Sequence, residues 1–283
     1  MSVSYYPYII AGFIMAMFLF GGLFLKGEHP PDYIVCNSTD MVIAFLDVGH
    51  GDCTVITDGD ITIVVDTGSI FTTEKVLNYL YKMSVDDIDY LFVTHPHADH
   101  DGGVSAIYNY YTVHNYYTNK NISRGNRLVD GDIYMYVLNP SKSKTYSNVN
   151  DESIVLLLVK KDFELLLTGD IETKSENDII HSSANVNADV LKVAHHGSDT
   201  SSQRDFLLHV SPDISVISCS DMYGNPNKAV VERLMKMSSV YITARDGDVI
   251  MTTDGCGTIQ VQLPESDLKT TYMAVGDSYL PGG

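Results

Sequence analysis

The stretch THPHADHDGG, residues 94–103, gathers three histidines and two aspartates within ten positions. It follows the apolar run IDYLFV, which predicts a buried strand, so the motif lies on the turn after that strand and at the start of a helix. Imidazole nitrogens and carboxylate oxygens bind zinc at about 2.0–2.2 Å, and open coordination positions distinguish catalytic sites from structural ones. We therefore expect four side chains to face one cavity and to build parts of two metal sites, namely His95, His97, Asp99 and His100.

Two later apolar strands are predicted to end on further side chains of the kinds that bind metals. FELLLTGD brings Asp170 to one strand end, where a carboxylate can bridge two cations about 3.5–4 Å apart, although an N-cap for the following helix is an alternative role. VLKVAHHGS brings His195 and His196 to another. Because adjacent residues of a strand point to opposite faces, we expect one of these histidines to be a ligand and the other to contact substrate or to orient a ligand.

The rest of the chain after residue 40 alternates β-branched apolar runs with amphipathic stretches. This pattern predicts strands at 41–48, 53–58, 61–68, 88–95, 111–117, 132–138, 153–160, 163–169, 188–196, 213–220, 240–244, 248–253 and 258–263, and helices at 72–83, 172–181, 203–210 and 226–237. Two strand-rich halves with helices between the strands predict a layered α/β sandwich whose core is closed on both faces.

The first 25 residues carry no charged side chain, and YIIAGFIMAMFLFGGLFL is apolar almost throughout. A bilayer core of about 30 Å needs about 20 such residues in a helix. A cleaved signal peptide, which usually has a basic start and a shorter apolar region, and a buried helix of a soluble domain are the alternatives. We expect a transmembrane anchor or uncleaved signal at 1–26, a tether at 27–40, the folded domain at 41–263 and a tail at 264–283. The chain is then a single-pass membrane protein, and we place its folded domain on the extracytoplasmic side.

The charge balance restricts the partners of the chain. With 36 acidic and 18 basic residues the formal net charge is −18, so the surface repels polyanions unless a local basic strip or a bound cation offsets this charge. A protein that coats nucleic acid is therefore disfavoured. The four cysteines are widely spaced and form no C-x-x-C pair, which indicates neither a zinc knuckle nor a disulfide framework.

Six motifs in order along the chain, from about Val42 to about Leu263, resemble those of metallo-β-lactamase superfamily hydrolases: FLDVGHGD, VVDTG, THPHADHDGG, LLLTGDIE, LKVAHHGS and YGNP. The first and fifth resemble more narrowly the hydrolase domain of ComEC-type competence proteins. The resemblance implies an αββα sandwich with a dimetal site at one edge, between the two sheets. It assigns the first metal to His95 and His97, the second to Asp99 and His100, the bridge to Asp170 and the last ligand to His196, which stands directly before a glycine as is common in the family.

Other roles also follow from the resemblance. Asp99, Asp170 and His195 are expected to take part in catalysis, and three early carboxylates are expected to orient ligand histidines or to hold turns, namely Asp47, Asp52 and Asp66. Many superfamily members have a histidine in the stretch that here reads SNVNDESIVLLL, so we expect a less tightly held first metal. The ComEC-type branch has glutamine where His50 stands and histidine where Asn225 stands, which alters the substrate contacts expected there.

A dimetal site lowers the pKa of a bridging water towards neutrality and explains hydrolysis without a serine or cysteine nucleophile. The first functional hypothesis is a phosphodiesterase that acts on DNA or another phosphodiester through a metal-activated bridging hydroxide, with Lys142, Lys144 and Asn225 as substrate contacts. The alternatives are a small-substrate esterase, of phosphocholine esterase or β-lactamase type, and a non-catalytic, membrane-tethered metal-binding module. The ligand types suit two divalent ions, zinc first and manganese also, and no protein partner can be predicted.

Overall fold

The computed structural model describes residues 40–182, 184–220 and 224–264. The predicted anchor lies outside these residues, as do all but one residue of the predicted tether and of the predicted tail. Within the part of the chain that the structure describes, no helix is both long and apolar enough to cross a membrane. The prediction of an anchor therefore stays a prediction.

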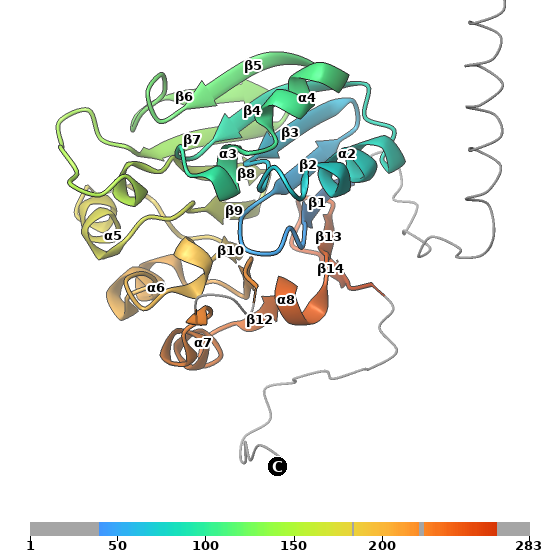
Figure 1. Cartoon of the computed structure of the whole chain (residues 1–283). Helices are drawn as coiled ribbons and strands as arrows, with labels where there is room; N and C mark the ends of the chain where they lie inside the picture. The colour runs from blue at the N-terminus through green and yellow to red at the C-terminus, as the bar shows by residue number, and fades with distance from the viewer. Residues whose placement is uncertain (1–39, 183, 221–223, 265–283) are drawn as a thin grey trace, which may run out of the picture. The chain divides into compact units, whose positions relative to one another are not determined.

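The described residues form two seven-stranded sheets (Figure 1). The order of strands in the first sheet is β14 (Ile259–Gln262), β13 (Val249–Thr253), β1 (Met41–Phe45), β2 (Thr54–Asp58), β3 (Ile61–Val65), β4 (Asp87–Val93) and β5 (Thr112–Thr118). The order in the second is β12 (Ser239–Ile242), β11 (Ile214–Ile217), β10 (Val190–Lys192), β9 (Phe163–Leu167), β8 (Val155–Lys160), β7 (Ile133–Asn139) and β6 (Arg127–Asp130). Strands β3 to β5 are parallel to one another, as are β9 to β12.

Two apolar cores hold these layers together. The first lies between the sheets and takes side chains from both, among them Phe45, Phe92 and Leu158. The second lies between the second sheet and the helices α5 (Thr173–Ile180), α6 (Arg204–Val210) and α7 (Lys228–Leu234), which Figure 1 shows beside that sheet. Strand β8 reads VLLLVK and is apolar on both faces because it contributes to both cores.

Short helices cover the other face of the first sheet. Val76, Tyr79 and Leu80 are the buried residues of α2 (Thr73–Lys82), and Ile107 is the buried residue of α4 (Val104–Tyr110). The predicted layered α/β sandwich is therefore confirmed. Strand β6, helix α4 and the short helix α8 (Thr243–Asp246) were not predicted.

One predicted strand is wrong at its end. Strand β10 ends at Lys192, and residues Ala194–Gly197 form a 3-10 turn, although a strand was expected to continue to residue 196. His195 and His196 have φ angles of 51° and 54°, which lie in the left-handed region that β-strands do not use. The alternation of side chains along a strand therefore does not apply to this pair.

The two sheets meet at the carboxyl ends of their parallel strands. Gly169, directly after β9, has φ +51°, and a Cβ there would lie 2.9 Å from Ser153 Cβ and 3.0 Å from Thr94 Cβ. Only a residue without a side chain fits this contact without a shift of its neighbours. Thr94 follows β4, so the side chains after β4 and those after β9 enter the same space.

Candidate metal centre

Four side chains with ligand atoms follow β4 on one short segment. His95 is fully buried, His97 is exposed and precedes α3 (Ala98–Asp101), and His100 within α3 is fully buried. The segment packs tightly against the loop after β3: Thr67 N donates to His100 O at 2.7 Å, and a Cβ on Gly103 would lie 2.6 Å from Thr67 O. The loop after β3 therefore fixes the position of α3.

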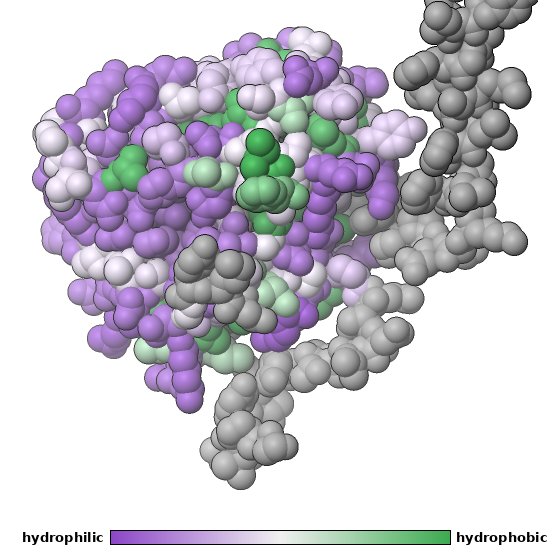
Figure 2. Space-filling model, viewed as in Figure 1, coloured by the Kyte–Doolittle hydropathy of each residue, from purple (hydrophilic) through white to green (hydrophobic). Residues whose placement is uncertain are grey.

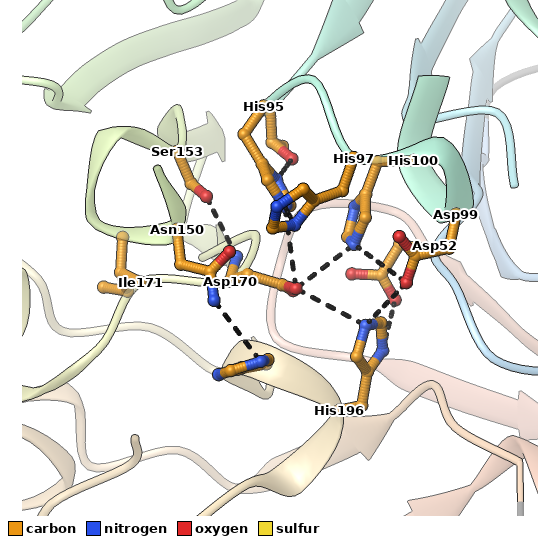
Figure 3. A network of polar contacts seen from close by, with 12 residues as sticks. Asp52, His95, His97, Asp99, His100, Asn150, Ser153, Asp170, Ile171 and His196 are labelled. Atoms are coloured by element: carbon orange, nitrogen blue, oxygen red, sulfur yellow. Dashed lines mark hydrogen bonds and ion pairs between the residues drawn. The ribbon is translucent and has the colours of Figure 1, made fainter. Parts of the chain in front are cut away.

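The predicted ligands converge on Asp170, as Figure 3 shows. Asp170 Oδ2 lies 3.3 Å from His100 Nε2, 3.4 Å from His196 Nε2 and 3.7 Å from His95 Nε2. Asp99 Oδ2 lies 3.4 Å from His196 Nε2 and 3.9 Å from His100 Nε2. Two ligand atoms that each lie about 2.1 Å from one tetrahedral cation are about 3.4 Å apart, so these separations suit shared cations.

The ligand atoms form overlapping groups in which all atoms lie within 4.8 Å of one another. The groups are His95, His97 and Asp170; His100, Asp170 and His196; His50, Asp99 and His196; and Asp52, Asp66 and His100. Asp170 is common to the first two groups, which is the arrangement that a bridging carboxylate requires.

Buried atoms without partners support a metal at this site. Among the described residues, His100 Nε2, His196 Nε2 and Asp170 Oδ1 are buried and have no hydrogen-bond partner. A buried polar atom that makes no bond destabilises a fold by about 1–3 kcal/mol, and charged groups by more. Divalent cations coordinated by these atoms would remove that penalty, so the residues present fit the metal ions.

The pKa values of the buried histidines are shifted in opposite directions: that of His95 is lowered, and those of His100 and His196 are raised. Burial, with a contribution from the charge of His100, lowers the pKa of His95 to about 3, so His95 offers a neutral nitrogen lone pair. Burial also disfavours charge on His196, but the carboxylates of Asp170 and Asp99 outweigh it and raise the pKa of His196 to about 10. The pKa of His100 is raised for a related reason, because Asp170 and Asp66 outweigh its burial.

The carboxylates respond in the opposite direction. Burial alone would raise the pKa of Asp170, but the charges of His100 and His196 hold it well below its usual range. Burial also acts to raise the pKa of Asp99, but the contact with His196 and the charge of His100 hold it below its usual range. Without metal, imidazolium protons therefore balance the carboxylates, and a bound cation must displace those protons.

Two contacts orient the ligand histidines. Asp66 Oδ2 lies 2.8 Å from His100 Nδ1, and the same carboxylate accepts hydrogen bonds from Thr94 N at 2.7 Å and Thr94 Oγ1 at 2.8 Å. Ser218 O lies 2.9 Å from His196 Nδ1. Because Nδ1 of each ring is engaged, Nε2 of each ring faces Asp170.

The other two early carboxylates differ from each other. Asp52 forms a buried ion pair with Lys192 at 2.7 Å, and its second oxygen lies 3.8 Å from His196 Nδ1. Asp47 accepts a hydrogen bond from Gly49 N at 3.1 Å, which is the turn role that was the alternative for this residue. The structure thus brings Asp52 and Asp66 against histidines and places the Asp47 carboxylate in a turn.

His195 and His196 lie in different surroundings although they are adjacent. His196 faces Asp170 and Asp99, as described above, and is buried. His195 is partly exposed: its Nδ1 lies 3.1 Å from Thr200 Oγ1 and 3.5 Å from Glu172 Oε1, and its Nε2 lies 3.4 Å from Asn150 Nδ2. The left-handed turn, rather than strand alternation, separates the two rings.

Several residues at the site were not predicted. Asn150, Glu172 and Thr200 surround His195. Asn150 belongs to the stretch in which many superfamily members have a histidine. A polar side chain in that stretch was the sequence feature that could have indicated a place at the site. His50 was noted only as a difference from the ComEC-type pattern, and its Nε2 lies 3.9 Å from Asp99 Oδ2, with its ring centroid 4.3 Å from that of His196.

The predicted substrate contacts lie on two loops. Lys142 and Lys144 are exposed on the loop after β7, and Lys144 Nζ lies 3.3 Å from Asp178 Oδ1 on α5. Asn225 is partly buried and precedes Pro226, whose Cβ would be 2.8 Å from a Cβ on Gly197. Asn225 therefore stands beside the turn that carries His195 and His196, whereas the charge of Lys144 is partly balanced by Asp178.

Comparison with known proteins gives the family. Residues 46–164 match the model of the metallo-beta-lactamase superfamily. The chain is 27% identical over 250 residues to "Competence protein ComA" of Neisseria gonorrhoeae. The alignment covers 85% of this chain and 35% of that protein. It is 32% identical over 222 residues to "Recombination protein 2" of Haemophilus influenzae, with 72% of this chain and 28% of that protein covered. The chain thus spans about a third of the length of the curated relatives it matches.

A solved structure supports the fold. The chain superimposes on a putative metal-dependent hydrolase from Parabacteroides distasonis with a TM-score of 0.50 at 15% identity, which covers 71% of this chain and 93% of that one. At that level of identity the likeness concerns the fold alone. The fold agrees with the family match, and the chain contains a metallo-beta-lactamase superfamily domain, as its similarity to a competence protein and a recombination protein also indicates.

Proposed function

We propose that this chain is a dimetal phosphodiesterase that hydrolyses DNA. The observation that carries the proposal is the convergence of His95, His100 and His196 on Asp170. Among the described residues, His100 Nε2, His196 Nε2 and Asp170 Oδ1 are buried and have no hydrogen-bond partner. The SNVNDESIVLLL stretch adds no histidine to the first group, which has three candidate ligands, His95, His97 and Asp170. Asp99 can join the second group as a fourth, so the first metal would have fewer protein ligands than the second.

The divalent ions, zinc or manganese, supply a water-derived nucleophile at neutral pH and offset the charge of the phosphodiester. The residues of the chain hold and orient these ions. Asp170 joins the two ligand groups, Asp66 fixes the ring of His100, and Asp99 completes the second group through its contact with His196. His195, held by Thr200 and Asn150 beside the ligands, contacts the substrate.

The relatives support DNA as the substrate class. Two of them carry the names competence protein and recombination protein, and both names refer to proteins that handle DNA. We further propose that residues 1–26 anchor the chain in a membrane as a single span and that the hydrolase domain at 41–263 lies on the extracytoplasmic side. The uncharged, apolar sequence of the first 25 residues supports the span.

A small-substrate esterase is the second candidate, and two observations favour it. The net charge of −18 opposes the approach of a polyanion, and Asp178 partly neutralises Lys144. A phosphocholine ester or a β-lactam would not depend on either feature, because the metal ions themselves would contact the reacting group.

The deciding experiment assays the full chain, loaded with zinc or manganese, against single-stranded DNA, duplex DNA, bis-p-nitrophenyl phosphate, a phosphocholine ester and a β-lactam. We expect cleavage of DNA and of bis-p-nitrophenyl phosphate. Asp170→Asn, which keeps the shape of the side chain and removes its charge, should abolish both activities and lower the bound metal measured by elemental analysis. Hydrolysis of the phosphocholine ester or the β-lactam alone would replace the proposal by the second candidate.

A further inference from the structure

A small pocket adjoins the candidate metal centre on the side of the edge strand β5. It has a volume of about 160 Å³, and its lining includes His95, Pro96, Asp101, Tyr116, Asn119 and Lys120. His95 belongs to both places, since its Nε2 lies 3.7 Å from Asp170 Oδ2. The pocket and the candidate metal centre therefore share the buried side chain of His95. We call it the Tyr116 pocket.

An aromatic ring forms one wall of the Tyr116 pocket. Tyr116 on β5 is 36% exposed, and its ring packs edge-to-face against Tyr108 of α4, with ring centroids 5.9 Å apart. This contact fixes the orientation of the Tyr116 ring. Figure 2 shows pale atoms of intermediate hydropathy among hydrophilic ones over β5 and α4, at the top of the view. A flat ring in the pocket would contact the face or edge of Tyr116.

The polar groups of the Tyr116 pocket are of two opposite kinds. Asn119 Nδ2 is buried and has no hydrogen-bond partner among the residues that the structure describes. It can donate to an acceptor on a ligand, and a ligand that supplies one would remove the penalty of the unbonded amide. The carboxylate of Asp101 is an acceptor only and suits a ligand N–H group. A matching ligand therefore presents both an acceptor and a donor.

The lining of the pocket carries one acidic and one basic side chain, so it favours neither an anion nor a cation. Asp101 opposes a phosphate, and Lys120, which pairs with Glu152 at 2.5 Å, opposes a quaternary ammonium group such as that of choline. A neutral, planar ring with donors and acceptors on its edge meets neither obstacle, and a nucleobase is such a ring.

We propose that the Tyr116 pocket seats one unpaired base of a nucleic acid strand whose backbone lies at the metal centre. This proposal rests on the function proposed above and makes it specific for single strands. In a duplex the pairing edge of each base is occupied and both of its faces are stacked, so only an unpaired base can enter. The volume of about 160 Å³ suits one ring system, whereas pockets for larger ligands measure about 300–1,000 Å³.

The test measures base recognition apart from charge and turnover. The full, zinc-loaded chain is titrated with a labelled methylphosphonate oligothymidine, which is neutral and resists hydrolysis, and with an abasic strand of the same length and backbone. Base–aromatic stacking is a sequence-tolerant interaction, and we expect the strand with bases to bind about tenfold more tightly than the abasic strand. Tyr116→Ala should remove this preference, and Tyr116→Phe, which keeps the ring, should retain it.

Tyr110→Ala is the matched control, because Tyr110 is a 73% exposed tyrosine on α4 that does not line the pocket. It should leave the tenfold preference unchanged, and Asn119→Ala should reduce it in part. Circular dichroism melts establish that each variant folds. Equal binding of the two strands by the native chain, no measurable binding of either, or an unchanged preference in Tyr116→Ala would overturn the proposal. Displacement of the strand by phosphocholine in the native chain but not in Tyr116→Ala would assign the pocket to a choline ester instead.

Cleavage assays keep this proposal separate from the proposed function. If the chain cleaves DNA but binds both methylphosphonate strands equally, the pocket assignment fails and the nuclease function stands. If the base preference is present but neither single-stranded nor duplex DNA is cleaved with zinc or manganese, the nuclease function fails and the base-binding pocket stands.

Discussion

Asp66 contacts His100 through Oδ2 and Nδ1 at 2.8 Å, and it accepts two hydrogen bonds from Thr94 with the same carboxylate. One buried side chain thus links the loop after β3, the end of β4 and the ring of a candidate ligand. Asp66 itself has φ 60°, a conformation that aspartate and asparagine tolerate better than most residues. The position of His100 therefore depends on a carboxylate that does not belong to the groups around Asp170.

Asp66→Asn should lower the affinity for zinc by about 10- to 100-fold, because the amide no longer accepts charge-assisted hydrogen bonds in the same way and the ring of His100 loses its fixed orientation. Zinc titration against a competing chelator measures the affinity. Asp47→Asn is the control, since the Asp47 carboxylate holds the turn at Gly49, and it should leave the affinity unchanged. Equal loss in both variants would contradict the orienting role of Asp66.

His196→Ala and His195→Ala should have unequal effects. His196 is buried against Asp170 and Asp99, so its loss should reduce the bound metal and abolish hydrolysis. His195 contacts Thr200 and Asn150 instead, so its loss should leave the metal content intact and slow hydrolysis. Elemental analysis and steady-state kinetics on the same preparations separate the two effects. Equal metal loss in both variants would show that both rings bind metal.

Glu176 should make the stability of the chain depend on pH. It is 1% exposed on α5, where it accepts hydrogen bonds from Gln203 N at 3.0 Å and from Ser202 N. Burial raises the pKa of Glu176 from 4.5 to about 7, although these hydrogen bonds and Arg233 oppose the rise. Between these two values the folded state keeps a proton that the unfolded state has released, so the free energy of unfolding falls as the pH rises.

Glu176→Gln removes this titration. Relative to that variant, the native chain should lose up to about 3 kcal/mol of unfolding free energy between pH 4.5 and about 7, because each unit of pKa shift corresponds to about 1.4 kcal/mol. Urea titrations of both proteins at several pH values give the difference. A difference that is constant across this range would contradict the raised pKa.

Changing Lys142 and Lys144 together to alanine tests the DNA substrate. If both lysines contact phosphates, binding of DNA should weaken for all sequences and the log–log salt dependence should flatten by about one to two units, the smaller value reflecting the pairing of Lys144 with Asp178. Hydrolysis of bis-p-nitrophenyl phosphate should not change. Loss of both activities would indicate damage to the metal centre, and loss of neither would favour the small-substrate esterase.

Removal of residues 1–37 tests the predicted anchor. The residues of all candidate ligand groups lie at or after His50, so the truncated chain should keep its hydrolase activity and move from the membrane fraction to the soluble fraction. Centrifugation of lysates with and without the deletion measures the distribution. A full chain that already fractionates as soluble would contradict the anchor.

The layered fold could be predicted from the sequence because most of its strands are continuous apolar runs. Strand β8 reads VLLLVK and strand β4 contains the run YLFV, and both are bounded by polar or turn residues. Strand β6 could not be predicted, since RLVD has two apolar residues and lies partly exposed at the edge of the second sheet. Its place depends on pairing with β7 rather than on its own pattern.

The set of residues near Asp170 could also be predicted, because histidines and aspartates follow the carboxyl ends of parallel strands. The conformation of His195 and His196 could not. Both adopt left-handed φ values that few residues other than glycine use, and no pattern in the preceding VLKV indicates it. The contacts of His195 with Asn150 and Thr200 join segments 45 and 5 residues away, and the longer of these exists only once the second sheet has formed.

Because the candidate ligands come from both sheets, a newly made chain can bring them together only after the parts of both sheets that carry them have been synthesised. His95 to His100 follow β4, whereas Asp170 and His196 follow β9 and β10. Strand β1 also pairs with β13, so the first sheet stays incomplete until residues near the end of the described part have been synthesised. A chain emerging from the ribosome therefore cannot assemble the candidate metal centre until strands of both sheets have been synthesised.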